Sequence, residues 1–166
     1  MAETTAGTGM PPDFEQLVRE HGPRIRRIAR RYAARGAVDD LVQDILVRLW
    51  RSYPSFRSEA KVETWIYRVA LNASMTHVKD SMRARASEVA IASSAPPLAT
   101  TPAVTSMADV LESFLAALGD IDASILMMYL DGLTAKEMSG VLGIAANAIS
   151  VRISRLKQKF SATYID

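Results

Sequence analysis

The chain has 166 residues, 49% of them apolar, so it can bury the core of one ordinary domain or of two small ones. It contains no cysteine, which excludes disulfides and cysteine-ligated metal sites. No apolar run approaches the ~20 residues of a membrane span, and the N-terminus lacks the pattern of a signal peptide. We therefore expect a soluble, cytoplasmic protein with no membrane insertion.

The formal net charge is only +2, but the basic residues are unevenly distributed. Seven arginines lie between Arg19 and Arg35, five basic residues lie between Lys136 and Lys159, and none occurs from Ala86 to Ala135. Two separate basic zones indicate two surfaces that could touch phosphate. Solvated arginines on helix surfaces are the alternative explanation for the first zone.

Residues 1–12 are predicted to be a disordered tail, and residues 13–83 a first helical block. The apolar residues from Phe14 to Tyr32 share one helix face, although Gly22 and Pro23 should bend or break that helix. Asp39 and Asp40 favour the start of an amphipathic helix that runs to Trp50. Tyr53-Pro54-Ser55 should end it. A third helix is expected to turn these residues inward: Val62, Trp65, Ile66, Val69 and Ala73.

Residues 84–106 are rich in Ala, Ser, Thr and Pro and are predicted to be a linker. A second helical block follows over residues 107–166, and no segment alternates with period two. The sequence therefore predicts an all-α fold of two small helical domains joined by a flexible linker. Fully extended, that linker spans up to ~70 Å, about two turns of DNA at roughly 34–36 Å per turn.

The segment from Asp131 to Phe160 has the pattern of a helix-turn-helix. Thr134 and Glu137 form a capping box, and Gly143 lies where a tight turn needs positive φ. A stripe of apolar residues then marks the inner face of the second helix: Ile149, Ile153, Leu156 and Phe160. The rest of that helix carries amide, hydroxyl and basic groups, which bond base edges and phosphates. DNA is thus the first partner to test, and a helical hairpin with a solvated basic face is the alternative.

Three segments, in this order, resemble the extracytoplasmic-function sigma factors of bacterial RNA polymerase. Val38–Trp50 (VDDLVQDILVRLW) looks like the family's polymerase-binding helix, and Lys61–Asn72 (KVETWIYRVALN) is similar to its promoter-melting segment. Asp131–Phe160 looks like the domain that reads the −35 element. The resemblance implies a protein that directs promoter-specific transcription initiation and performs no covalent chemistry.

The resemblance also assigns roles to individual residues. Those implied to dock on the β′ clamp helices are Asp40, Gln43, Asp44, Val47 and Trp50. Those implied to face the −10 element are Phe56, Tyr67, Arg68 and Asn72. In the recognition helix, bases would be met by Asn147, Ser150 and Arg152, and phosphates by Arg155 and Lys159. The implied partners are core RNA polymerase (β′ clamp helices and β subunit), promoter DNA and an anti-sigma factor, with no cofactor, metal or small-molecule substrate.

Several positions depart from the family pattern. Leu71 stands where an Arg is frequent, and residues 76–79 replace a common Asp followed by paired Arg. The −10 specificity is therefore left open. Ser150 replaces a common Lys, and Ala145 lies where a capping Ser is frequent.

Two other functions are compatible with parts of the sequence. A helix-turn-helix regulator that does not engage polymerase would use the same recognition helix, but has no reason to carry the two N-terminal segments together. An enzyme could use Asp39, Asp40 and Asp44 to hold Mg²⁺. Because the chain has only two histidines and no Gly-rich phosphate loop, we expect no enzyme.

Overall fold

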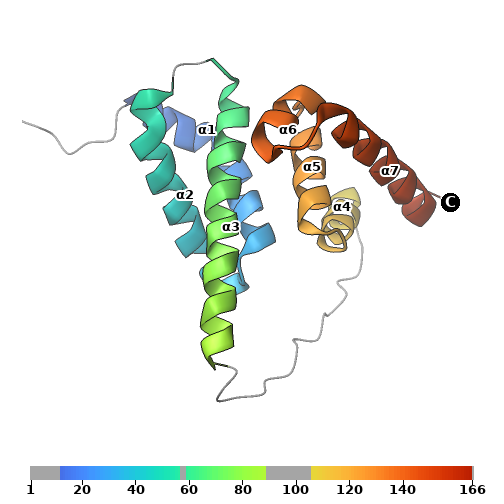
Figure 1. The fold of residues 1–166 in the computed structure, drawn as a ribbon, viewed down its shortest axis with the longest axis horizontal. Helices are drawn as coiled ribbons and strands as arrows, with labels where there is room; N and C mark the ends of the chain where they lie inside the picture. The colour runs from blue at the N-terminus through green and yellow to red at the C-terminus, as the bar shows by residue number, and fades with distance from the viewer. Residues whose placement is uncertain (1–11, 57–58, 89–105, 166) are drawn as a thin grey trace, which may run out of the picture. The chain divides into compact units, whose positions relative to one another are not determined.

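The computed structural model describes residues 12–56, 59–88 and 106–165, which form helices and turns without a strand (Figure 1). The α-helices are α1 (Pro12–Tyr32), α2 (Val38–Ser52), α3 (Val62–Glu88), α4 (Met107–Ala116), α5 (Asp120–Leu130), α6 (Ala135–Leu142) and α7 (Ala146–Tyr164). Two short 3₁₀ helices, η1 (Arg35–Ala37) and η2 (Tyr53–Ser55), flank α2. The all-α prediction is confirmed. No helix in these described segments is long and apolar enough to cross a membrane.

The expected tail and linker fall mainly outside the described residues. Of the tail, only Pro12 is described, and it begins α1. The prediction of a linker from residue 84 is wrong at its start, because α3 continues through Glu88. Ala84, Arg85 and Ala86 are strong helix formers that extend the helix. Residues 89–105 lie outside the described part.

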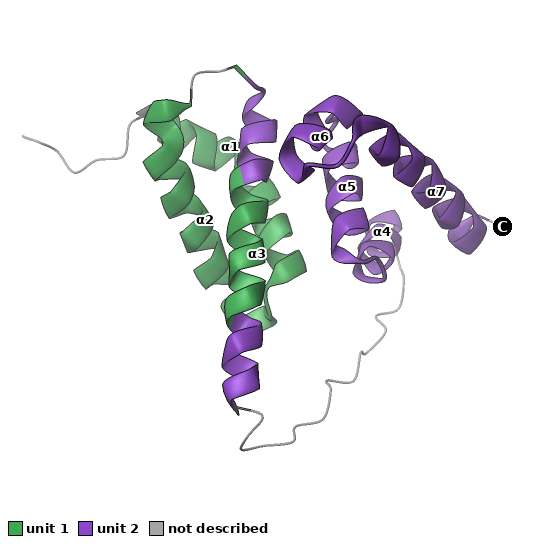
Figure 2. Ribbon diagram, viewed as in Figure 1, with its two compact units in different colours: residues 1–59, 69–80 green, residues 60–68, 81–166 purple. Residues whose placement is uncertain are grey.

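The chain forms two compact units (Figure 2). The first comprises residues 1–59 and 69–80, and the second comprises residues 60–68 and 81–166. Helix α3 therefore contributes to both units. The domain boundaries at 13–83 and 107–166 remain predictions.

In the first unit, α1 packs against α2. The buried side chains come from one face of each helix: Phe14, Leu17, Ile25 and Ile28 from α1, and Leu41, Ile45 and Leu49 from α2. The expected break at Pro23 is wrong, since α1 is continuous through it. An interior proline costs about 3 kcal/mol, and full burial of Ile25 and Ile28 offsets this at about 1.5–3 kcal/mol each.

The second unit is built around α5, which packs against α4 and α7. The middle of α5 is buried, including Ala123, Ile125, Met127 and Met128. Helix α6 packs on α7, and each contributes to the core through Met138, Ile149 and Leu156. Because α5 is apolar nearly all round, it can pack against α4 and α7 at once.

Candidate nucleic-acid and polymerase interfaces

Helix α6 begins with the predicted capping box. The Thr134 hydroxyl accepts from the Glu137 backbone N–H at 3.2 Å, and the Glu137 carboxylate accepts from the Thr134 N–H at 2.7 Å. Lys61 Nζ lies 3.1 Å from the same carboxylate. The Thr134 backbone bond, followed by Lys61, lowers the pKa of Glu137. These contacts hold the start of α6 in one orientation.

The turn between α6 and α7 depends on Gly143, whose φ is +69°. This left-handed conformation is unfavourable for residues with a Cβ, and the glycine closes α6 by donating its N–H to Ser139 O at 2.9 Å. Helix α7 then starts at Ala146, only three residues later. The predicted helix-turn-helix is confirmed.

Helix α7 buries Ile149 and Leu156 and leaves its opposite side exposed. At 100° per residue, the row of side chains that points directly away from the core consists of Asn147, Val151, Ser154 and Gln158, all of them exposed. We call these four residues the outward row. Val151 and Ser154 were not among the predicted site residues. The sequence could have identified them, because they lie opposite the apolar stripe.

The first turn of α7 has no side-chain bond at its Ala145 N-cap. Instead, Asn147 Oδ1 accepts from the Ala148 N–H at 2.8 Å, and the Ser150 hydroxyl donates to Ala146 O at 3.1 Å. Both predicted base-contacting residues are exposed. Their polar groups bond the backbone of the first turn of α7.

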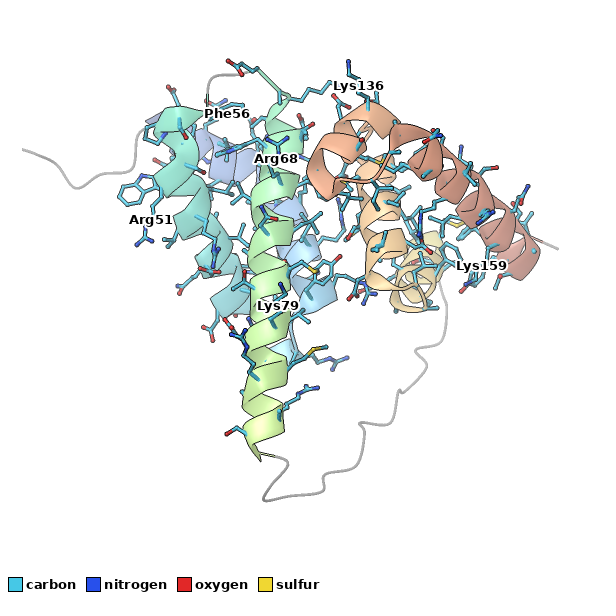
Figure 3. The ribbon with its side chains drawn as sticks, viewed as in Figure 1. Arg51, Phe56, Arg68, Lys79, Lys136 and Lys159 are labelled. Atoms are coloured by element: carbon cyan, nitrogen blue, oxygen red, sulfur yellow. The ribbon has the colours of Figure 1, made fainter. Side chains whose placement is uncertain are left out.

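Arg152 lies apart from the outward row. Its guanidinium donates to Asp122 of α5 at 2.7 Å, and both side chains are partly buried. A pocket of about 400 Å³ opens beside this pair, lined by Leu118, Asp122, Ala148, Val151, Arg152, Arg155, Leu156 and Lys159. Arg155 and Lys159 are exposed at this pocket, and Lys159 extends from the C-terminal half of α7 (Figure 3). The structure thus separates Arg152, bonded to α5, from two exposed basic residues.

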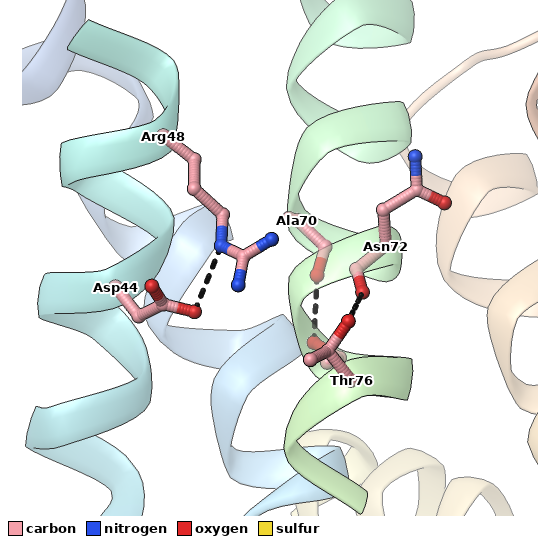
Figure 4. A network of polar contacts seen from close by, with 6 residues as sticks. Asp44, Arg48, Ala70, Asn72 and Thr76 are labelled. Atoms are coloured by element: carbon pink, nitrogen blue, oxygen red, sulfur yellow. Dashed lines mark hydrogen bonds and ion pairs between the residues drawn. The ribbon is translucent and has the colours of Figure 1, made fainter. Parts of the chain in front are cut away.

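Helix α2 has an outer face that combines polar and apolar groups. Asp40 and Gln43 are exposed, while Val47 is 42% and Trp50 49% exposed. Asp44 accepts from Arg48 Nε at 2.9 Å (Figure 4). Since Asp40, Asp44 and Val47 follow at helical spacing, they share one face, with Gln43 and Trp50 beside them. The structure brings all five predicted polymerase-contacting residues to this surface.

The four residues predicted to face the −10 element have different environments. Arg68 and Asn72 are exposed and Phe56 is half-buried. Asn72 extends from α3 on the side away from α2, as seen in Figure 4. Tyr67, however, is fully buried and donates its hydroxyl to Asp131 at 2.6 Å. In this structure its ring is not accessible to an unpaired base.

The α3 positions that depart from the family pattern can also be located in the structure. Leu71 is buried, so the position where relatives often carry Arg contributes to the core here. Thr76 is exposed, and its hydroxyl donates to Asn72 O at 3.0 Å (Figure 4). Lys79 is exposed further along the helix (Figure 3). The part of α3 predicted to face the −10 element therefore has no arginine at position 71, where a leucine is buried instead.

The carboxylates of Asp39 and Asp44 form ion pairs. Arg26 Nη1 lies 2.8 Å from Asp39 Oδ1, and Asp44 pairs with Arg48. Within residues 12–56, 59–88 and 106–165, no three His, Cys, Asp or Glu side chains group together in a way that could hold a metal ion. This arrangement gives no support to the magnesium alternative.

Comparisons with known proteins show which proteins this chain is similar to. The family model for Sigma-70 region 2 matches residues 17–84. The chain is 26% identical to the ECF RNA polymerase sigma factor SigM of Mycobacterium tuberculosis over 150 residues, which cover 89% of this chain and 75% of SigM. It is 23% identical to the ECF RNA polymerase sigma-E factor of Escherichia coli over 158 residues, covering 87% and 83%. Residues 17–84 thus match the Sigma-70 region 2 family, and the chain as a whole is similar to extracytoplasmic-function sigma factors.

Two solved structures have a fold similar to that of this chain. CnrH, solved in complex with the cytosolic domain of CnrY, matches with a TM-score of 0.60 and 25% identity over 90% of this chain and 86% of CnrH. RpoE of Bartonella quintana, solved with the anti-sigma factor NepR, matches with a TM-score of 0.73 and 18% identity, covering 92% and 96%. Extracytoplasmic-function sigma factors are transcription regulators rather than enzymes. In this chain the region 2 match, residues 17–84, includes α2 and most of α3.

Proposed function

We propose that this chain is a sigma factor that binds core RNA polymerase, directs it to two-part promoters and helps to open the −10 element. The observation that carries the proposal is the exposed pair Val47 and Trp50 on α2, flanked by Asp40 and Gln43. Large apolar side chains left in water beside carboxylates are typical of a binding surface rather than of a solvated helix. A DNA-binding regulator that works without polymerase has no use for such a face.

The chemistry of this α2 face suits a basic, partly apolar partner such as the clamp helices of the β′ subunit. Trp50 offers a large aromatic anchor, and aromatic residues dominate the energetics of many interfaces. Asp40 is exposed and Asp44 is half-buried, so their carboxylates would orient the partner and speed its association. Docking would exchange the Asp44–Arg48 pair for contacts with the partner.

For the −10 element, we propose that Arg68, Asn72 and Phe56 receive unpaired bases. Opening a duplex requires unstacking energy, which a protein recovers by stacking bases on aromatic or Arg surfaces and by bonding their edges. Tyr67 joins this surface only after its bond to Asp131 breaks. The proposal therefore depends mainly on the exposed side chains of Arg68 and Asn72.

For the −35 element, we propose that α7 enters the major groove. Its N-terminal turns present Asn147 and Ser150, and recognition helices contact bases through their N-terminal residues. Arg155 and Lys159 would neutralise backbone phosphates on the flank of the helix. Arg152 would fix the angle of α7 through Asp122 instead of touching a base.

We also propose an anti-sigma factor as a further partner. CnrH was solved with the cytosolic domain of CnrY and RpoE with the anti-sigma factor NepR. The exposed apolar side chains on α2 would be covered by such a partner until a signal releases the sigma factor. Its place of action would be the cytoplasm, with polymerase and chromosome, and it would need no cofactor.

Reconstitution with bacterial core RNA polymerase tests the proposed function. The full chain should co-elute with the core enzyme on a sizing column and give run-off transcripts from promoters selected by the holoenzyme. Asp44→Arg should abolish co-elution while leaving binding to −35 duplex unchanged. Glu112→Arg, an equal charge change on exposed α4, is the matched control and should retain both activities.

Two outcomes would contradict the proposal in different ways. Clean separation of the wild-type chain from core polymerase, with retained DNA binding, would favour the polymerase-independent regulator. Equal loss of both activities in Asp44→Arg would mean that the substitution unfolds the protein or that the α2 surface is assigned wrongly. Circular dichroism of the variant separates these two explanations.

A further inference from the structure

Val151 is placed at the centre of the outward row of α7. It is the sixth residue of that helix, counted from Ala146, and 49% of its surface is exposed. Asn147 precedes it by four residues and Ser154 follows it by three, so both are its neighbours on the surface. An apolar side chain thus occupies the middle of a row that is otherwise polar.

Burial does not explain this valine. The α7 core is filled by Ile149 and Leu156 on the opposite side, and Val151, although it is one of the residues that line the open pocket with Leu118, keeps 49% of its surface exposed. A β-branched residue also lowers helix propensity slightly. Neither packing nor helix formation therefore requires a valine at this position.

The chemistry of the major groove offers one matching group. Among the base edges exposed there, only thymine presents an apolar substituent, the C5 methyl, while the other edges present hydrogen-bond donors and acceptors. Valine makes no side-chain hydrogen bond, and its single preferred rotamer in a helix leaves little entropy to lose on contact. It can favour thymine by apolar contact and can disfavour a polar edge by leaving it unbonded.

We propose that Val151 is a specificity-determining residue that selects a thymine in the −35 element through its C5 methyl group. The proposal rests on the proposed entry of α7 into the major groove. It adds one apolar contact, in the second turn of the helix, to the polar contacts of Asn147 and Ser150. Arg155, one turn further along, would hold a phosphate beside it.

The test selects duplexes from a library randomised over a short window, using the full-length chain, and compares wild type with Val151→Ala. Wild type should enrich thymine at one position, and Val151→Ala should lose that preference while keeping the others. Leu130→Ala on α5 is the matched control, because Leu130 is equally exposed and apolar but lies outside α7. Its base preferences should equal those of wild type.

A second measurement isolates the methyl group. Replacing the selected thymine by deoxyuracil removes only that methyl, and wild-type affinity should fall about fourfold, the value for one buried methyl. Val151→Ala should show no fall. A wild-type chain that enriches no sequence would overturn the proposed −35 reading itself. Enrichment with unchanged thymine preference and unchanged deoxyuracil response in Val151→Ala would overturn only the role of Val151.

Discussion

The guanidinium of Arg152 and the carboxylate of Asp122 lie 2.7 Å apart and join the recognition helix α7 to the first turn of α5. Both groups are partly buried, so the ion pair is shielded from part of the solvent. The pair therefore sets the orientation of α7 relative to the core of its unit, and it withdraws the Arg152 charge from the outward row.

A double-mutant cycle should detect this coupling. Combining Arg152→Ala and Asp122→Ala in urea unfolding should give an interaction free energy of about 0.5–1 kcal/mol, the range for partly exposed pairs. Arg155→Ala with Asp122→Ala is the matched cycle and should give a value near zero. Arg155→Ala alone should weaken DNA binding and lower its salt dependence by about one unit. A change of preferred base in Arg152→Ala without loss of stability would support direct base reading instead.

Trp50 and Leu49 are neighbours in α2, and we expect Trp50 to contribute mainly to polymerase binding and Leu49 mainly to folding. Trp50→Ala should reduce affinity for core polymerase by about 2 kcal/mol, as expected for an aromatic anchor, with little effect on unfolding because the side chain is half exposed. Leu49→Ala removes a fully buried side chain and should lower the unfolding free energy by about 2–5 kcal/mol.

The two α2 variants are compared by urea unfolding and by competition with a labelled sigma factor for core polymerase. Normal polymerase affinity in Trp50→Ala would contradict the assigned surface. A large loss of stability in the same variant would mean that Trp50 acts chiefly as a core residue, like Leu49.

The two glycines of the α6 region should respond in opposite directions. Gly143→Ala places a Cβ at a φ of +69° and should destabilise the protein by about 1–2 kcal/mol. Gly140→Ala lies inside α6, where its Cβ would meet Arg68 Nη2 at an ordinary 3.6 Å, and should stabilise by about 0.5–1 kcal/mol. Thermal unfolding measures both, and destabilisation by Gly140→Ala would show that the Arg68 contact tolerates no added methyl.

Local features of the fold could be predicted from the sequence because their causes lie within a few residues. The capping box of Thr134 and Glu137 and the turn at Gly143 depend on the chain immediately around them. The amphipathic helix that was predicted to begin near Asp39 and run to Trp50 also followed from helical spacing, and it corresponds to α2. These elements could therefore be predicted without any knowledge of tertiary contacts.

Other features of the structure could not be predicted from local sequence, because they depend on tertiary contacts. Tyr67 bonds Asp131 across 64 residues of sequence, and Arg152 bonds Asp122 across 30, so no local pattern indicates either contact. Pro23 stays inside α1 because burial on either side outweighs its local penalty. Leu71, which stands where the family pattern often has Arg, is part of the core.

The bond between Tyr67 and Asp131 is open to a direct test. Tyr67→Phe keeps the buried ring and removes the hydroxyl, so the unfolding free energy should fall by about 1–2 kcal/mol, since the acceptor is charged and partly exposed. Asp131→Asn keeps a hydrogen-bond acceptor at that position and should lower the unfolding free energy by less. If Tyr67→Phe keeps full stability but opens promoters poorly, the hydroxyl serves DNA in the open complex.

Glu137 should make the stability of the helix-turn-helix depend on pH. Its pKa is lowered from the ordinary value of 4.5, first by the Thr134 backbone N–H and then by Lys61, so the charged form stabilises the fold. That contribution is complete above pH 4.5 and is lost as the pH falls through the lower pKa of the folded state. Glu137→Gln has no charge to lose, so the difference in unfolding free energy between wild type and variant should shrink with acidification.

Urea unfolding of both proteins between about pH 7 and pH 3 measures the Glu137 effect. Glu112→Gln, an exposed carboxyl change on α4, is the control and should show no such trend. Added salt should reduce the part of the difference that comes from Lys61, because exposed ion pairs are screened, and should leave the part from the Thr134 bond. A difference that stays constant down to the lowest pH would contradict the lowered pKa and would assign the capping effect to the shape of the side chain alone.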